Sequence, residues 1–209
     1  MMKKFWMILL AILPIGLWAQ DNTWELPEEE QQQEETTLEA KVNPNAKYLR
    51  GAVPEVDGKV VFSKTIEAPG KSAAQIYTIL HNYMVKMTKA SNQINSHLIV
   101  EDSVKQELGA SFEEWLVFKK TAIQLDQTRL YFVLEVQCEN GKANVSMNRI
   151  HYLYDENRKP ERYKAEGWIT DDDAVNKKNT KLYPGSGKFR RKTIDRKDFI
   201  FDKFESLLK

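Results

Sequence analysis

Residues Thr128 to Tyr154 read as two long strands joined by a tight turn at Asn140-Gly141. A two-residue hairpin turn of type I′ needs a positive φ at both central positions, and Asn-Gly adopts that conformation most readily. Because the turn fixes the pairing register, it predicts three pairs on one apolar face: Cys138 with Ala143, Val136 with Val145 and Leu134 with Met147. The chain is therefore expected to fold around an antiparallel hairpin with one buried face.

The apolar pattern of the second strand changes phase near its middle. Its apolar residues first occupy odd-numbered positions and then even-numbered positions, which lie on opposite faces of a regular strand: Ala143, Val145 and Met147, followed by Ile150, Tyr152 and Tyr154. Arg149 and His151 stand where the first parity would continue. Either a β-bulge near Met147–Arg149 shifts the phase, or both faces of that end of the sheet are covered, and we favour the bulge.

Residues 1–19 have the pattern of an export signal. Lys3 and Lys4 precede an apolar run, and Ala19 supplies the small residue that cleavage requires. The run is too short to cross a bilayer, so we expect a removable signal peptide, no membrane span afterwards, and a periplasmic or secreted protein. Cys138 is the single cysteine, which excludes an intrachain disulfide, and its strand position predicts a small core residue.

Residues 20–46 form a leader of different composition. Residues 21–40 contain eight acidic and no basic side chains, and residues 28–35 are all glutamate or glutamine. Such a segment buries too little apolar surface to offset its ordering entropy, so we expect it to be disordered. The remaining residues, 47–209, have the length of one domain with a single core.

The domain begins with a strand and a helix. A strand is predicted over Lys59–Glu67, and Ser72 with Gln75 forms a capping box at the start of a helix that runs to about Ala90. Two further strands are predicted before the hairpin: His97–Glu107 and Phe112–Ile123. The hairpin completes a set of four consecutive antiparallel strands.

The region 160–191 is less regular. Thr170 and Asp173 predict a capped short helix that runs to about residue 179, residues 183–187 read as a turn, and a final helix is predicted from about residues 193–195. The order is thus β-α-β-β-β-β-α, and each long helix has one apolar stripe. This predicts an α+β two-layer sandwich in which an antiparallel sheet carries both helices on one face.

Three segments resemble motifs of the secreted bacterial domain-of-unknown-function family 4468: residues 58–65 (GKVVFSKT), 165–171 (AEGWITD) and 187–195 (GKFRRKTID). The first looks like the opening motif of the family, and the other two are similar to its closing motifs. The resemblance covers most of residues 47–209 and implies a fold like that of TATA-box-binding protein (a TBP-like fold). It implies no activity, and the name of the fold does not imply DNA binding, because function resides in sites rather than folds.

The sequence offers no catalytic or metal-binding motif. His81, His97 and His151 lack a second ligand at metal-binding spacing, and residues 171–173, all aspartate, lack the glycine and closing glutamate of a calcium loop. No nucleophile elbow, phosphate-binding loop or dinucleotide fingerprint is present. We predict no cofactor, no metal and no catalytic residue, and export with a net charge of +1 argues against a nucleic-acid partner.

A basic stretch is the first candidate for an interaction site. Lys188, Arg190, Arg191 and Lys192 directly precede the predicted last helix, and the free N–H groups and dipole of a helix N-terminus favour anions. These four residues are therefore a candidate anion-binding site. Alternatively, their side chains pair with aspartates 171–173 or with glutamates of the sheet.

The far face of the sheet is the second candidate. If Leu116 and Phe118 face the helices, the side chains of opposite parity on two neighbouring strands point away from the helices: Trp115, Val117, Tyr131 and Val133. Uncovered, such a cluster would bind a partner or ligand, with Trp168 as a further candidate. Alternatively, the insertion 160–191 covers this face through Trp168 and Tyr183.

Two classes of function follow from these features. The first is an exported, non-enzymatic domain that binds an envelope protein, a peptide or a small apolar ligand through the far face. The alternative is a hydrolase that acts on an envelope polymer, which would need acidic or histidine side chains gathered in a cleft.

Overall fold

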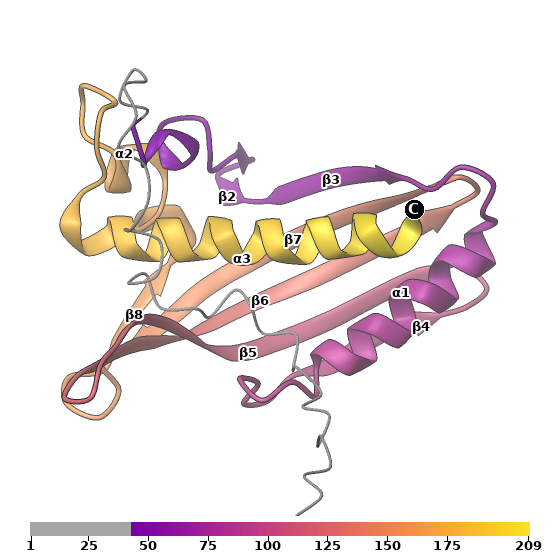
Figure 1. The fold of residues 1–209 in the computed structure, drawn as a ribbon, viewed down its shortest axis with the longest axis horizontal. Helices are drawn as coiled ribbons and strands as arrows, with labels where there is room; N and C mark the ends of the chain where they lie inside the picture. Colours follow the sequence, from indigo (N-terminus) through magenta and orange to yellow (C-terminus); the bar gives the residue numbers. More distant parts are fainter. Residues whose placement is uncertain (1–42) are drawn as a thin grey trace, which may run out of the picture.

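The computed structural model describes residues 43–209, so the predicted export signal and residues 20–42 of the predicted leader lie outside the described part. Figure 1 shows one antiparallel sheet with two long helices, α1 (Ala73–Met87) and α3 (Pro184–Leu208), on the same face. No helix within residues 43–209 is both long enough and apolar enough to span a membrane. The arrangement confirms the predicted α+β two-layer fold.

The main sheet has six strands: β3 (Phe62–Glu67), β4 (His97–Asp102), β5 (Glu107–Lys120), β6 (Leu125–Glu139), β7 (Lys142–Tyr154) and β8 (Glu161–Lys164). Its order is β3-β7-β6-β5-β4, and β8 pairs with the end of β7 that β3 does not reach. A small ribbon of β1 (Glu55–Val56) and β2 (Lys59–Val60) precedes it. The predicted first strand is therefore split at Val61, β5 begins earlier than predicted, and β8 was not predicted.

The central hairpin has the predicted register. Cys138 lies opposite Ala143, and the other two predicted pairs also form. The predicted type I′ turn is wrong, because only Gly141 has a positive φ, 81°, which is the pattern of a type II turn. The side chain of Asn140 instead accepts a hydrogen bond of 2.9 Å from the main-chain N–H of Ala73, and thus ties the turn to the start of α1.

The predicted bulge in β7 is confirmed. Tyr131 pairs with His151 but Val133 pairs with Asn148, so β7 holds one extra residue in this interval. Arg149 accommodates it with a φ of 54°, which is unusual for a residue with a side chain. Beyond the bulge the buried parity of β7 is reversed, as the predicted phase change required.

The core lies between the sheet and the two helices. Ser72 caps α1 with the predicted capping box, in which Ser72 Oγ accepts from the N–H of Gln75 and Gln75 Oε1 accepts from the N–H of Ser72. The helix buries one apolar stripe and ends at Met87 rather than at residue 90. Below it, the rings of Phe112 and Phe132 stack with centroids 4.8 Å apart.

The last helix starts earlier than predicted. It begins at Pro184, a residue that suits the first helical position because the N–H that proline lacks has no partner there. Residues 183–187 therefore do not form a turn outside the helix. Ser186 Oγ donates to the carbonyl of Asp173 at 2.7 Å, which fastens this end of α3 to the short helix α2 (Asp171–Ala174). Helix α2 itself ends well before residue 179.

Candidate functional site

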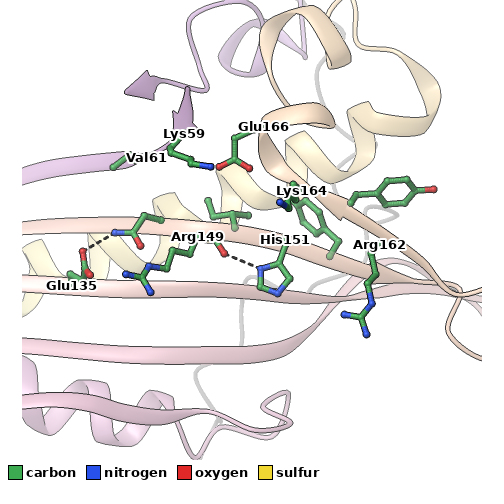
Figure 2. Close-up of a pocket in the computed structure, with 12 residues that line it drawn as sticks. Lys59, Val61, Glu135, Arg149, His151, Arg162, Lys164 and Glu166 are labelled. Carbon is green, nitrogen blue, oxygen red and sulfur yellow. Dashed lines mark hydrogen bonds between the residues drawn. The ribbon is translucent and has the colours of Figure 1, made fainter. Parts of the chain in front are cut away.

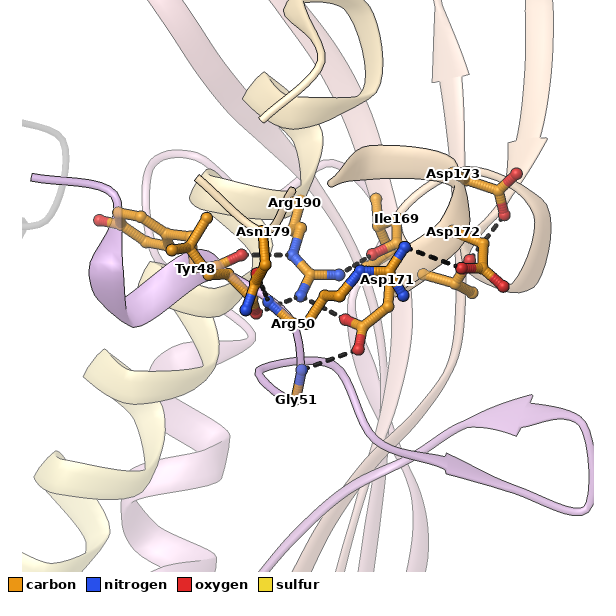
Figure 3. A network of polar contacts seen from close by, with 11 residues as sticks. Tyr48, Arg50, Gly51, Ile169, Asp171, Asp172, Asp173, Asn179 and Arg190 are labelled. Atoms are coloured by element: carbon orange, nitrogen blue, oxygen red, sulfur yellow. Dashed lines mark hydrogen bonds and ion pairs between the residues drawn. The ribbon is translucent and has the colours of Figure 1, made fainter. Parts of the chain in front are cut away.

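The buried guanidinium of Arg190 joins α3 to two segments that are distant in sequence, residues 48–49 and 169–171. Figure 3 shows it surrounded by oxygen atoms from three segments, and the side chain is fully buried. It donates to the carbonyls of Tyr48, Leu49 and Ile169 at 2.6 to 2.7 Å and pairs with Asp171 at 2.6 Å. Burial lowers the pKa of Arg190. All of these contacts are within the chain, so Arg190 is a structural residue and is not available to an external anion.

The other residues of the predicted anion site point in different directions. Lys188 pairs with Asp126 at 2.7 Å and lies over the ring of Phe118. Arg191 donates to Asn45 Oδ1 at 2.7 Å, and Lys192 is half-buried elsewhere on the helix. The four basic residues lie within α3 rather than before it. The predicted anion site at Lys188, Arg190, Arg191 and Lys192 is therefore wrong. The alternative, pairing with aspartates 171–173 or with glutamates of the sheet, holds for Arg190, which pairs with Asp171, whereas Lys188 pairs with an aspartate of the sheet, Asp126.

The far face is defined here as the sheet face opposite α1 and α3. Leu116 is buried and Phe118 packs on Phe189 of α3, so both face the helices as predicted. The side chains of the opposite parity on β5 point to the far face, where Trp115 and Val117 are half-buried. Tyr131 is likewise half-buried, whereas Val133 has only 9% of its surface exposed.

The insertion does not cover the far face through its aromatic residues. Trp168 stacks on Tyr163, with ring centroids 4.0 Å apart, and contacts Phe189 edge-on. Since Phe189 belongs to the core beneath α3, Trp168 lies on the helix side of the sheet. Tyr183, directly before α3, is 41% exposed. Trp168 is therefore not part of the candidate binding cluster on the far face.

A ladder of polar contacts lies across the aromatic side chains of the far face. Arg129 donates to Glu113 at 2.8 Å and to Glu156 at 3.0 Å, and its guanidinium lies 5.3 Å from the centre of the Trp115 ring. The Tyr131 hydroxyl donates to Glu113 at 2.9 Å, and burial together with this bond raises the pKa of Tyr131. The far face is thus aromatic and ion-paired rather than purely apolar.

A notch interrupts the sheet edge beside this ladder. Strands β3 and β8 both pair with the same edge of β7, but β3 begins opposite Met147 and β8 ends opposite His151. The three residues from Asn148 to Ile150 therefore pair with neither strand. A cavity of about 680 Å³ lies here, and we call it the edge notch. It is bounded by Lys59, Glu135, Arg149, His151, Arg162, Lys164 and Glu166.

The edge notch has a basic rim. In Figure 2, Lys59 and Glu166 point toward one another on one side, and Arg149, His151 and Arg162 follow β7 and β8 on the other. Glu166 also accepts a hydrogen bond from the N–H of Val60 at 3.2 Å. Four cationic side chains and two carboxylates, those of Glu135 and Glu166, thus line the notch. Within residues 43–209, Arg149, Arg162 and Lys164 form no ion pair.

His151 connects the notch to the far face. Its ring stacks on Tyr131 with centroids 4.5 Å apart and an angle of 3° between the ring planes. Its Nδ1 lies 3.0 Å from the carbonyl oxygen of Arg149, the residue at the bulge. The aromatic ladder and the basic notch therefore form one continuous surface.

No sequence motif marks the edge notch. Its one available signal was the phase change at Arg149, because bulges often re-aim side chains next to functional sites. The second wall comes from Lys59 and Glu166, which are far apart in the sequence and meet only in the folded chain. A single charged residue of this kind belongs to no sequence motif that would mark it as part of a site.

His81 and the aspartates considered as metal ligands have other contacts in the structure. His81 lies 2.7 Å from Glu101, and residues 43–209 contain no group of three or more side chains placed to hold a metal ion. The aspartates 171–173 serve structural contacts: Asp171 binds Arg190 and the N–H of Gly51, and Asp172 binds Arg50 (Figure 3).

The fold defines the class of the protein first. A sheet of antiparallel strands with two long helices on one face matches the crystal structure of a TBP-like protein from Parabacteroides distasonis, with a TM-score of 0.61 and 20% identity. The match covers 75% of this chain and 96% of that chain. At this identity the likeness concerns the fold alone, and the chain is an α+β domain with a TBP-like fold.

The family follows from two further matches. The family model described as "Domain of unknown function (DUF4468) with TBP-like fold" matches residues 62–153. A DUF4468 family protein from Bacteroides ovatus, known from a crystal structure, is 42% identical with a TM-score of 0.73, covering 78% of this chain and 94% of that chain. The chain belongs to the DUF4468 family, which confirms the resemblance noted from its motifs. No curated protein matches the chain.

Proposed function

We propose that the mature protein is an exported, non-enzymatic binding domain of the cell envelope that takes a partner protein or peptide on the far face. The proposal is carried by one observation: both long helices cover the same face of the sheet, while Trp115 and Tyr131 lie half-buried on the other. Aromatic side chains of this kind supply large contact area at low entropic cost and anchor many interfaces. Export is inferred from the pattern of residues 1–19.

The polar ladder favours a macromolecular partner over a small apolar ligand. Glu113, Arg129 and Glu156 place charged groups beside the aromatic rings, and a purely apolar ligand would take these groups out of water without offering them any polar contact. A protein or peptide supplies polar groups as well as apolar side chains. Interfaces between proteins combine an aromatic centre with a polar rim in this way.

The geometry supports binding more than hydrolysis. A hydrolase needs two groups able to exchange protons with a substrate in one cleft. The two carboxylates of the edge notch already accept hydrogen bonds, Glu135 from Asn148 at 2.8 Å and Glu166 from the N–H of Val60 at 3.2 Å. No further observation favours the hydrolase alternative.

The test compares the full-length mature protein with its Trp115→Ala Tyr131→Ala variant as bait in envelope extract from the native organism. We expect the variant to retain less than about one tenth of any specific capture, because central aromatic residues commonly contribute more than about 1.4 kcal/mol each to binding. A melting curve of the variant, recorded in parallel, shows whether it remains folded.

A matched control removes two other exposed side chains. Ile99→Ala Val100→Ala alters the edge strand β4, where these residues are 48% and 40% exposed. The control should capture partners like the unmodified protein. Equal capture by all three proteins would contradict the proposal.

A further inference from the structure

Exposed apolar side chains are concentrated at one edge of the sheet. Residues 43–209 contain eight exposed large apolar side chains, and four of them lie in residues 94–104: Ile94, Ile99, Val100 and Val104. This segment holds the strand β4 and the chain on either side of it, and Val104 is 90% exposed. Single exposed apolar residues are normal on a protein surface, whereas a group of them marks an interaction surface.

The main chain of β4 has one free side. β4 is the last strand in the order of the sheet and pairs with β5, so no strand within residues 43–209 lies along its other side. The N–H and C=O groups on the free side of an edge strand can pair with another extended chain. β4 therefore offers main-chain hydrogen bonds to a partner strand as well as apolar side chains.

A bulge places two of these apolar side chains on one face. Leu98 lies opposite Ala110 and Val100 lies opposite Gly109, so Ile99 is an extra residue in β4. A Cβ on Gly109 would come within 3.1 Å of Val100 and within 3.3 Å of Ile99. Because Gly109 has the parity of the far face, both side chains lie on that side of the sheet.

The other side chains of β4 follow from the pairing with β5. His97 and Asp102 lie opposite residues 111 and 107, which have the parity of the far face. Leu98 and Glu101 lie opposite residues 110 and 108, on the side of the helices. The 2.7 Å contact of Glu101 with His81 of α1 agrees with this assignment.

This distribution allows β4 to pair with a second copy of itself. In a two-fold symmetric antiparallel pair, residues that lie opposite one another share a face of the sheet. The register that pairs all six residues of β4 meets this condition throughout, with Ile99 opposite Val100, His97 opposite Asp102 and Leu98 opposite Glu101. A shift by one or two residues would place side chains of opposite faces against one another.

The charges at the edge fit the same register. Within residues 43–209, His97 forms no ion pair or side-chain hydrogen bond. Asp102 Oδ1 accepts from the N–H groups of Val104 and Lys105, both at 2.9 Å, and Oδ2 lies 3.9 Å from the Lys105 ammonium. Oδ2 thus has only a distant partner, and pairing of two copies brings His97 of the other copy beside it. The same register brings Val104 next to the segment of the other copy that carries Ile94.

We infer that β4 is the interface of a symmetric homodimer, in which two copies pair their β4 strands antiparallel with Ile99 opposite Val100 and His97 opposite Asp102. Bulges and charged residues commonly protect a free edge from unspecific pairing. In β4 the same features select one register and one partner, a second copy of this chain. The inference goes beyond the proposed function, since pairing along the edge extends the sheet and leaves the far-face aromatic residues of β5 and β6 uncovered.

The test measures the molar mass of the full mature protein by analytical ultracentrifugation from about 1 to about 200 μM. We expect a reversible equilibrium between monomer and dimer in this range, because an interface of one strand pair is small. Ile99→Lys Val100→Lys places cations against one another at the centre of the interface and should raise the dissociation constant of the dimer at least about tenfold. A melting curve shows whether this variant remains folded.

A matched control makes the same change elsewhere. Ile123→Lys Leu125→Lys introduces two lysines at apolar residues of the β5–β6 turn and the start of β6, which are 97% and 56% exposed. This control should form dimers like the unmodified protein. Equal weakening by both pairs would indicate a general effect of charge and would overturn the inference, as would a monomer at every concentration.

Single substitutions of His97 test the register. His97→Lys places a permanent cation opposite Asp102 and should tighten the dimer about threefold, whereas His97→Glu places a second carboxylate there and should weaken it about threefold. His97 is exposed, so neither change removes a core contact and the comparison holds even if the double variant at Ile99 and Val100 unfolds. Shifts in opposite directions would support the inference, and equal dissociation constants for the two variants would contradict it.

Discussion

Glu114 lies in the core although its side chain is charged. It lies on the helix-facing parity of β5, between the apolar Phe112 and Leu116, and it is fully buried. Both of its carboxylate oxygens accept hydrogen bonds of 2.7 Å from Arg196 of α3, and one also accepts from Gln93. A buried ion pair of this kind fastens the helix to the sheet at one register.

Removing one member of this pair should be strongly destabilising. We expect Glu114→Ala to lower the free energy of unfolding by about 3–5 kcal/mol, because it removes the carboxylate that pairs with the buried Arg196 guanidinium. The double variant Glu114→Leu Arg196→Met should be more stable than Glu114→Ala, since it removes both charges and keeps the volume. Urea denaturation measures both values. A loss below about 1 kcal/mol for the single variant would show that the pair is not buried in solution.

The thiol of Cys138 should be unreactive in the folded protein. It is 3% exposed, and burial raises its pKa to about 11. Because the thiolate is the reactive form, few molecules carry it at about pH 8. We expect a thiol reagent such as DTNB to label the native protein at least about a hundredfold more slowly than the urea-unfolded protein. Similar rates in both states would contradict the core position of Cys138.

At the scale of elements, α3 shows why the first residue of a helix cannot always be predicted from the sequence. The residues Pro184 to Gly187 have the composition of a turn, yet they form the first turn of the helix. Gly187 permits this, because a Cβ at that position would come within 2.6 Å of the Cβ of Leu182. The preference for glycine arises from a tertiary contact that local propensity cannot express.

Because of this contact, a substitution at Gly187 that favours helix formation should lower the stability of the domain. Gly187→Ala should destabilise the domain by about 1–3 kcal/mol through overpacking, although alanine is the better helix former. Gly185→Ala is the matched control, since a Cβ there would meet no atom within 4 Å, and it should be neutral or stabilising by up to about 1 kcal/mol. Thermal unfolding of both variants makes the comparison. A stabilised Gly187→Ala would refute the close packing.

The hairpin and the bulge show what local patterns do predict. The Asn-Gly signal fixed the pairing of β6 with β7, although the turn formed with another geometry. The phase change at Arg149 predicted the bulge because alternation has a strict period of two in a strand. The edge notch could not be predicted in the same way, since it depends on where β3 begins and β8 ends along β7, which is set by tertiary packing.

At the scale of the whole molecule, the two faces of the sheet have different tasks. The helix side holds the core, with Phe112, Phe132 and the buried Arg190 clamp. The far side carries half-buried aromatic residues under a ladder of ion pairs, and it continues into the basic notch. Strand parity predicted this division, but the placement of Trp168 on the helix side could not be read from the sequence, because it follows from the path of the insertion around the sheet.

Two neighbouring residues of β6 test this division most directly. Phe132 and Tyr131 are adjacent in sequence and face opposite sides of the sheet. Phe132→Ala should lower the free energy of unfolding by about 3–5 kcal/mol as a core truncation. Tyr131→Ala should cost only about 1–2 kcal/mol, for the lost hydrogen bond to Glu113 and the lost stacking on His151. Urea denaturation of both variants gives the measurement, and equal losses would contradict a far face that is free to bind a partner.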